Sequence, residues 1–224
     1  MTCLLLFLLV GTVPPFSARF ERVIIERGTP DTARGRICFV APWRIYYLVD
    51  YPLDQQLSVV KNTMTIYYPE QNSGFVIQAR SRLETPLSQQ SILAEDPRKT
   101  MSRLGFGLAG QTVRNDTTYA VWRPKRPGTN PLARVVFGRC GGRHVLTRVI
   151  RKDDRPLSET WFGDYVFIDT FALPTRIEHH RFADDGSRTE HIMTYTMVDT
   201  STAFIDSLGS FRVPNDAEMK RMKW

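Results

Sequence analysis

Two histidines lie at equal distances from a predicted turn. His179 and His191 are each six residues from Asp185, within the turn sequence Asp184-Asp185-Gly186. An antiparallel hairpin centred on that turn places the two imidazoles opposite each other across the strands. Imidazole nitrogens are common zinc ligands, and a neighbouring glutamate could add an oxygen ligand. Because no third ligand stands at a matching spacing, the sequence predicts a facing histidine pair and no metal site.

Common catalytic motifs are not present in the sequence. It has no G-x-S-x-G nucleophile turn, no G-x-x-x-x-G-K-S/T phosphate loop and no H-E-x-x-H zinc helix. The acidic pairs Asp153-Asp154 and Asp184-Asp185 are typical of solvated turns rather than of paired catalytic carboxylates. We therefore expect no catalytic residues, no cofactor and no enzymatic activity.

The three cysteines leave two interpretations open. Cys3 lies in the N-terminal segment, whereas Cys38 and Cys140 lie within the predicted folded domain. In an oxidising compartment Cys38 and Cys140 could form a disulfide. Two buried thiols are an equally good interpretation, because Cys38 falls within a predicted strand and nothing fixes its distance from Cys140.

The N-terminal segment has the features of an export signal. Leu4–Val10 is a run of seven apolar residues, which is too short to span a bilayer but suits the hydrophobic part of a signal peptide. We expect a signal peptide over residues 1–18 and one folded domain over residues 19–224. The alternative is a buried N-terminal helix that Pro14-Pro15 would break.

Composition favours a globular protein with a mildly basic exterior. Of the 224 residues 42% are hydrophobic, and 30 basic against 23 acidic residues give a formal net charge of +7. The basic residues are scattered singly and in pairs, without a run of like charge. A solvated surface explains this better than a nucleic-acid interface does, so we expect no nucleic-acid partner.

The segment Gly35–Pro69 is the centre of the predicted fold. From Ile37 to Tyr51 every odd position is apolar or aromatic, which predicts a long strand with one apolar face. Pro42 cannot donate a ladder hydrogen bond, so an edge, a bulge or a sharp bend is expected there. This face could belong to a β-sandwich core or to a wide, open sheet that shelters a lipid.

The remainder of the chain is rich in predicted strands. Alternating segments separated by turn residues predict an antiparallel meander of about ten strands in a single domain. The helical insertion follows Thr85-Pro86, with one helix over Leu87–Ala94 and a second over Pro97–Arg103. The residues after Ala217 are charged and are expected to fray.

The order and spacing of several residues resemble the bacterial outer-membrane lipoprotein carrier family, LolA and its relatives. The resemblance includes Thr85-Pro86-Leu87, which is similar to the start of the family's lid, and Phe211–Ala217, which is similar to its closing strand. Two features depart from the family pattern: Ala41 replaces an arginine, and no helix precedes the first strand. The matching positions in the central segment are Gly35, Ile37, Phe39, Pro42, Ile45, Tyr47, Pro52, Leu57, Tyr67 and Pro69.

This resemblance implies a mainly β fold, an open, incomplete antiparallel β-barrel with a short helical lid. It implies a monomeric periplasmic carrier that shelters acyl chains of lipoproteins or other lipids, with an inner-membrane donor complex and an outer-membrane acceptor. An envelope sensor or adaptor of the same fold that binds a protein partner is the alternative. The expected ligand-binding lining is Phe39, Trp43, Ile45, Tyr47, Val49, Met64 and Ile66. The expected lid residues are Leu87, Ile92, Leu93, Met101 and Leu104.

Overall fold

The computed structural model describes residues 13–41, 43–80, 97–201 and 211–223. Its strands are β1 (Phe16–Glu26), β2 (Thr29–Ala41), β3 (Arg44–Tyr51), β4 (Gln55–Val60), β5 (Thr63–Tyr68), β6 (Ser73–Gln78), β7 (Phe106–Arg114), β8 (Thr117–Pro124), β9 (Leu132–Cys140), β10 (Arg143–Arg151), β11 (Pro156–Ile168), β12 (Phe171–Phe182), β13 (Arg188–Asp199) and β14 (Glu218–Lys223). Its helices are the helix α2 (Pro97–Arg103) and the single 3₁₀ turns η1 (Pro69–Gln71) and η2 (Pro127–Thr129).

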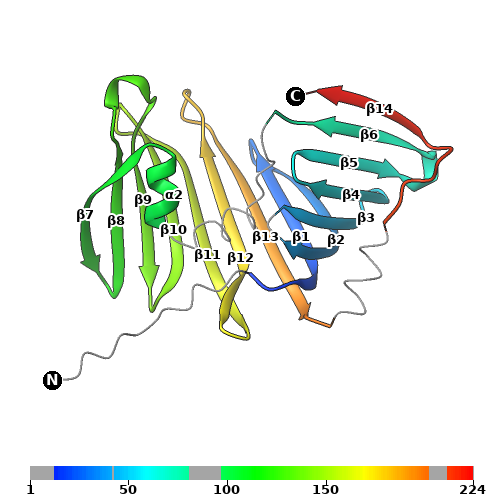
Figure 1. Cartoon of the computed structure of the whole chain (residues 1–224), viewed down its shortest axis with the longest axis horizontal. Coiled ribbons are helices and arrows are strands. Elements are labelled where there is room, and N and C mark those ends of the chain that lie inside the picture. Colours follow the sequence, from blue (N-terminus) through cyan, green and yellow to red (C-terminus); the bar gives the residue numbers. More distant parts are fainter. Residues whose placement is uncertain (1–12, 42, 81–96, 202–210, 224) are drawn as a thin grey trace.

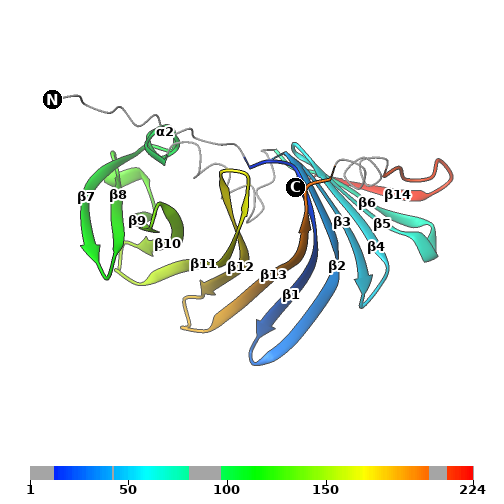
Figure 2. The ribbon, with the colours of Figure 1, turned by 90° about the horizontal axis from the view of Figure 1, so that it is seen from below.

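These strands form one sheet of 14, in the order β14-β6-β5-β4-β3-β2-β1-β13-β12-β11-β10-β9-β8-β7 (Figure 1). Neighbouring strands are antiparallel, except that β14 runs parallel to β6. Figure 2 shows that β7–β10 curl tightly at one end, while β13, β1 and β2–β6 form a wider arch. The two edge strands do not pair with each other in the described part of the chain. The expected open, incomplete barrel is confirmed, with more strands than the sequence indicated.

The predicted long strand is a hairpin made of β2 and β3. β2 ends at Ala41 and β3 begins at Arg44, so the strand is interrupted where the sequence indicated, although Pro42 itself lies outside the described residues. The register pairs Phe39 with Ile45 and Ile37 with Tyr47, so odd positions pair with odd positions. Paired residues share a face of a sheet, and the alternation therefore continues across the turn. The apolar face is therefore retained, although the prediction of a single long strand was wrong.

Two apolar clusters lie on the inner side of the curved sheet. The larger joins β1, β2 and β3 to β11, β12 and β13. Its fully buried members include Phe16, Ile37, Phe39, Ile45 and Leu173. The smaller cluster contains Met101 of α2, Phe106 of β7, Trp122 of β8, and Val135 and Phe137 of β9. Each curved half of the sheet thus has a core of its own.

The first strand begins inside the segment expected to be a signal peptide. Phe16 and Ala18 of β1 are 0% and 4% exposed, and they pair with Phe39 and Ile37 of β2. Val13, three residues before β1, is buried as well. Among the described helices, none is long and apolar enough to cross a membrane.

The C-terminal segment adds a strand instead of fraying. Glu218–Lys223 forms β14 and pairs with Ser73–Gln78 of β6. The preceding Phe211 packs against Tyr46 and Leu48, on the outer face of β3. Phe211–Ala217, expected to be the closing strand, is a connection with a turn. The closing strand thus starts one residue after the segment that the resemblance assigned to it.

The two cysteines of the folded domain are free thiols. Cys38 lies on β2 and Cys140 on β9, and five strands (β1, β13, β12, β11 and β10) separate them in the sheet. A disulfide requires Cα atoms about 6 Å apart, which this arrangement excludes. Burial raises the pKa of Cys38 to about 11, so its thiol stays protonated at neutral pH. The disulfide interpretation was wrong and the buried-thiol interpretation holds for Cys38.

Candidate functional site

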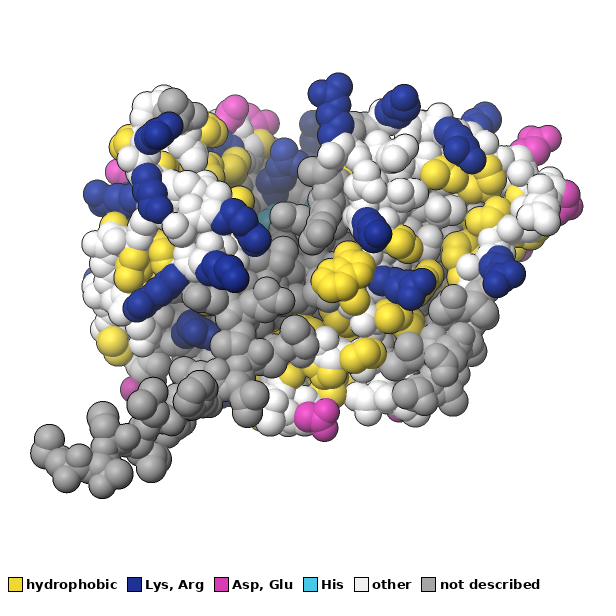
Figure 3. Space-filling view, in the orientation of Figure 1, with side chains coloured by type: hydrophobic (Ala, Val, Ile, Leu, Met, Phe, Trp, Pro, Cys, Tyr) yellow, Lys and Arg dark blue, Asp and Glu magenta, His cyan; other side chains and the backbone are white. Residues whose placement is uncertain are grey.

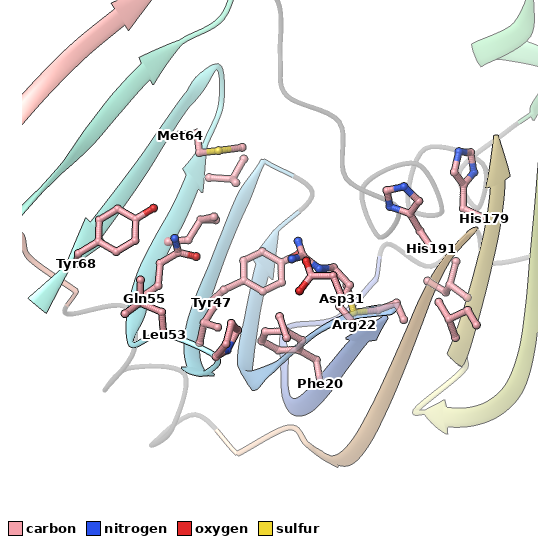
Figure 4. Close-up of a pocket in the computed structure, with 18 residues that line it drawn as sticks. Phe20, Arg22, Asp31, Tyr47, Leu53, Gln55, Met64, Tyr68, His179 and His191 are labelled. Atoms are coloured by element: carbon pink, nitrogen blue, oxygen red, sulfur yellow. The ribbon is translucent and has the colours of Figure 1, made fainter. Parts of the chain in front are cut away.

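A cavity of about 520 Å³ lies in the wide arch of the sheet, against strands β1–β5, β12 and β13. This volume is within the range of about 300–1,000 Å³ that is usual for small-molecule sites. Figure 4 shows the lining side chains, which point into one space from both sides of the arch. They are Phe20, Arg22, Asp31, Ala33, Tyr47, Val49, Pro52, Leu53, Gln55, Leu57, Val59, Met64, Tyr68, Ile177, His179, His191, Ile192 and Met193.

Three of the seven predicted lining residues line this cavity: Tyr47, Val49 and Met64. Ile66 alternates with Met64 on β5 and so points to the same side of the sheet, but it does not contact the cavity. The predicted residues of β3 and β5 that the alternation placed together thus lie on the side of the sheet that faces the cavity.

The other three predicted lining residues have different positions. Phe39 and Ile45 are 0% exposed and belong to the core beneath the cavity. Trp43 is 48% exposed at the turn between β2 and β3. Phe39 lies in the core because Phe16 stacks on it, with ring centroids 5.4 Å apart.

The helix α2 does not cover the cavity. Met101 packs with Trp122 and Phe137 at the far end of the sheet, while Leu104 is 62% exposed. Lys125 holds α2 in place, because its Nζ donates a hydrogen bond to Ser102 Oγ at 2.9 Å. The predicted roles of Met101 and Leu104 above the cavity were wrong. The remaining lid residues, Leu87, Ile92 and Leu93, lie outside the described residues.

The lower part of the cavity is apolar. Phe20 and Tyr47 meet edge to face, with ring centroids 5.5 Å apart, and Val49 packs against the same cluster. Across the arch, Ile177 is 1% exposed, and Met193 pairs with it in register. Figure 3 shows hydrophobic side chains over the β1–β6 half of this face, with Lys and Arg scattered around them. Such a surface gains free energy by taking an apolar guest out of water.

A band of polar side chains crosses the upper part of the cavity. His179 and His191 are direct partners on β12 and β13, with ring centroids 6.1 Å apart. The predicted facing pair is therefore confirmed. His179 Nδ1 lies 2.8 Å from Thr160 Oγ1 on β11, and Arg22 joins the band from β1. Among the described residues, no group of three or more His, Cys, Asp or Glu side chains could hold a metal.

Burial sets the protonation of the band. It lowers the pKa of both His179 and His191, and nearby positive charge lowers them further, so both imidazoles are neutral at pH 7. Burial also raises the pKa of Tyr47 to about 12, partly opposed by the Arg22 guanidinium, so its phenol keeps its proton. Arg22 is then a permanent positive charge beside neutral hydrogen-bonding groups.

The sequence did not identify Phe20, Arg22, Ile177 or Met193 as cavity residues. Their signal was present: Phe20, Arg22 and Ile24 alternate along β1, and Arg22 interrupts that apolar face. An arginine on the inner face of a strand is the feature that could have indicated a binding site. Its neighbours are fixed by the pairing of β1 with β13, which is remote in sequence.

His144 lies outside the cavity and provides a test of how burial affects a titratable side chain. It packs between Phe137 and Phe162, and its Nε2 lies 2.7 Å from Thr147 Oγ1. Burial, and then the Arg139 guanidinium, lower the pKa of His144 to about 3.

Unfolding restores the ordinary pKa of about 6.5, so the unfolded chain binds the extra proton between pH 6.5 and about 3. The contribution of neutral His144 to the free energy of unfolding is fully present above pH 6.5 and is lost on acidification. The loss from His144 alone is about 2 kcal/mol at pH 5. Urea unfolding of the wild type and His144→Gln at pH 7.5 and 5.0 measures this. The variant should lose less stability on acidification, and equal losses would contradict the prediction.

No protein-family model and no curated protein sequence matches this chain. Solved structures do match its fold. A DUF1329 family protein from Desulfovibrio piger has a TM-score of 0.55 at 15% identity, covering 89% of this chain and 93% of its own. A LolA superfamily protein from Nitrosomonas europaea has a TM-score of 0.54 at 12% identity, covering 84% and 86%.

The third structure is described as an outer-membrane lipoprotein-sorting protein domain, from Vibrio parahaemolyticus. It has a TM-score of 0.52 at 10% identity and covers 83% of this chain and 84% of its own. At these identities the likeness establishes the fold alone. The chain thus has a LolA-like fold along most of its length, as the sequence resemblance implied.

Proposed function

We propose that this protein is a non-enzymatic carrier that shelters the acyl part of a lipid or lipoprotein in the cavity of its open sheet. The observation that carries the proposal is a cavity of about 520 Å³ with an apolar part lined by Phe20, Tyr47 and Met193. The LolA-like fold supports the same conclusion, since two of the matching structures bear the names of the LolA superfamily and of lipoprotein sorting.

The energetics of such a carrier depend on chain length. Burying a methylene gains about 0.8 kcal/mol, so a chain with about ten buried methylenes gains about 8 kcal/mol before the costs of binding. A net affinity in the micromolar range corresponds to about 8 kcal/mol, so a longer chain with more buried methylenes must also offset the costs of binding. Binding of this strength holds a lipid in water and still permits its release to a membrane without nucleotide hydrolysis.

In this proposal the carrier works in the periplasm as a monomer. It takes lipid from an inner-membrane donor complex and delivers it to an outer-membrane acceptor. The scattered basic side chains on the cavity face keep this surface soluble while the apolar lining stays inside the arch (Figure 3).

Native mass spectrometry of the protein purified from a bacterial envelope tests the proposal. We expect a population heavier than the polypeptide by the mass of one lipid, which is lost after delipidation. The delipidated protein should bind a fluorescent fatty-acid probe, and unlabelled fatty acid should displace that probe. A protein that never carries lipid and does not bind the probe would rule the carrier function out.

A further inference from the structure

The cavity has a gradient of polarity along the strands. On β1 the inward positions run from the buried Phe16, Ala18 and Phe20 to the half-buried Arg22 and Ile24 and the exposed Glu26. On β12, Ile177 is buried, His179 is half-buried and Arg181 is exposed. In the register of the strands Arg22 lies level with Met193 and Ile177, one inward position before His191 and His179. A guest that fits this space must itself have an apolar part and a polar part.

Arg22 is the charged group where the polar part of the cavity begins on β1. Its Nε is buried and makes no hydrogen bond, and no ion pair joins its guanidinium to another described residue. The nearby carboxylates, Asp31 on β2 and Glu26 on β1, are both exposed to water. A buried donor on a permanent charge is costly to leave unpaired, so a ligand that pairs it gains affinity.

The histidine pair adds hydrogen-bonding groups one inward position further along the strands, where His191 pairs with Ile24 and is near enough to Arg22 for the guanidinium to lower its pKa. Thr160 occupies Nδ1 of His179, which leaves Nε2 of that ring for a ligand. His191 lies beside it and lines the same cavity. Figure 4 shows Arg22 and Tyr47 on one side of the cavity and the two histidines on the other. Neutral imidazole and phenol groups can each donate one hydrogen bond to an oxygen.

We propose that the cavity binds an amphiphile with one oxyanionic group, a carboxylate or a phosphate, which Arg22 and the His179–His191 pair hold while its chain lies against Phe20 and Tyr47. This inference rests on the proposed carrier function and specifies its cargo. A guanidinium recognises the oxygens of either anion in a planar, bidentate arrangement. A neutral lipid in the same cavity would leave the buried Nε of Arg22 unpaired.

Paired probes of equal chain length test the inference on the full chain. Isothermal calorimetry would compare palmitate, hexadecyl phosphate and the neutral methyl palmitate, with acetate and inorganic phosphate as anions that lack a chain. We expect at least one of the anionic lipids to bind about tenfold or more tighter than the ester, as for a hydrogen bond to a charged group. The free anions should bind too weakly to be measured.

The matched variants are Arg22→Met and Arg19→Met. Both residues lie on β1, but Arg19 is exposed and points to the opposite face of the sheet. R22M should bind the anionic lipids no tighter than the ester, while its circular dichroism spectrum matches that of the wild type, which shows that the fold is intact. R19M should keep the preference for the anion. A preference that persists in R22M, or that the wild type lacks, overturns the inference.

The outcomes separate this inference from the carrier function. If the ester and the anionic lipids bind equally well, the carrier function stands and the anion site fails. If no amphiphile binds at all, both fail. As a second readout, palmitate should raise the pKa of His179 and His191, and NMR titration of the imidazole signals measures this change. R22M should remove most of the shift. An unchanged pKa in the wild type would contradict the assigned contacts.

Discussion

Replacing Val49 by glutamate should lower the affinity for a neutral acyl probe by about 100-fold or more. Val49 lines the cavity beside Tyr47, and a carboxylate there must either lose its water or draw water into the apolar space. An unpaired buried charge costs several kcal/mol, which exceeds what a few methylenes can contribute. A neutral fluorescent ester is the probe, since repulsion of a lipid head group then plays no part.

Val113→Glu is the matched control for Val49→Glu. It makes the same chemical change on β7, where Val113 is 70% exposed and far from the cavity strands in the sheet. The control should bind the probe like the wild type. Val49→Thr keeps the side-chain shape and should lose less affinity for the probe. This variant can still be measured if the glutamate variant is unstable. Wild-type affinity in a folded Val49→Glu protein would show that lipid binds elsewhere.

Local alternation was sufficient to predict the apolar face, because it depends on neighbours in the chain. Odd positions remained on one side of β2 and β3 even though a turn replaced the expected continuous strand. The histidine pair followed from symmetry about Asp185, which is also local, and the register of β12 with β13 confirmed it. Faces and hairpin partners are therefore predictable from this sequence.

Which residues of that face belong to the core and which line the cavity was not predictable in the same way. Phe39 and Val49 lie on the same face, but Phe39 is in the core and Val49 lines the cavity. The difference arises because Phe16, in a segment that has the features of a leader, stacks on Phe39. Arg22 was missed for a related reason, since its position opposite Met193 and near the histidines depends on β1 pairing with β13. Such contacts join segments that are more than 160 residues apart, as with Ile24 and His191.

Phe39→Ala should destabilise the protein by about 3–5 kcal/mol, the usual cost of removing a buried phenylalanine side chain. Phe39 is 0% exposed, and the deletion leaves a space beside the ring of Phe16 that the β1–β2 pairing prevents from closing. For a chain of this length the loss corresponds to a fall in melting temperature of roughly 10 °C. Urea unfolding followed by tryptophan fluorescence and circular dichroism measures the change.

Trp43→Ala is the informative comparison, because the alternation placed Trp43 and Phe39 on the same lining. Trp43 is 48% exposed at the turn, so its removal should cost less than about 1 kcal/mol. If Phe39 were part of the lining and not of the core, Phe39→Ala would weaken lipid binding and leave the empty protein about as stable as Trp43→Ala does. A large loss of stability in lipid-free Phe39→Ala, with Trp43→Ala near the wild type, instead requires β1 to begin at Phe16 as part of the folded domain.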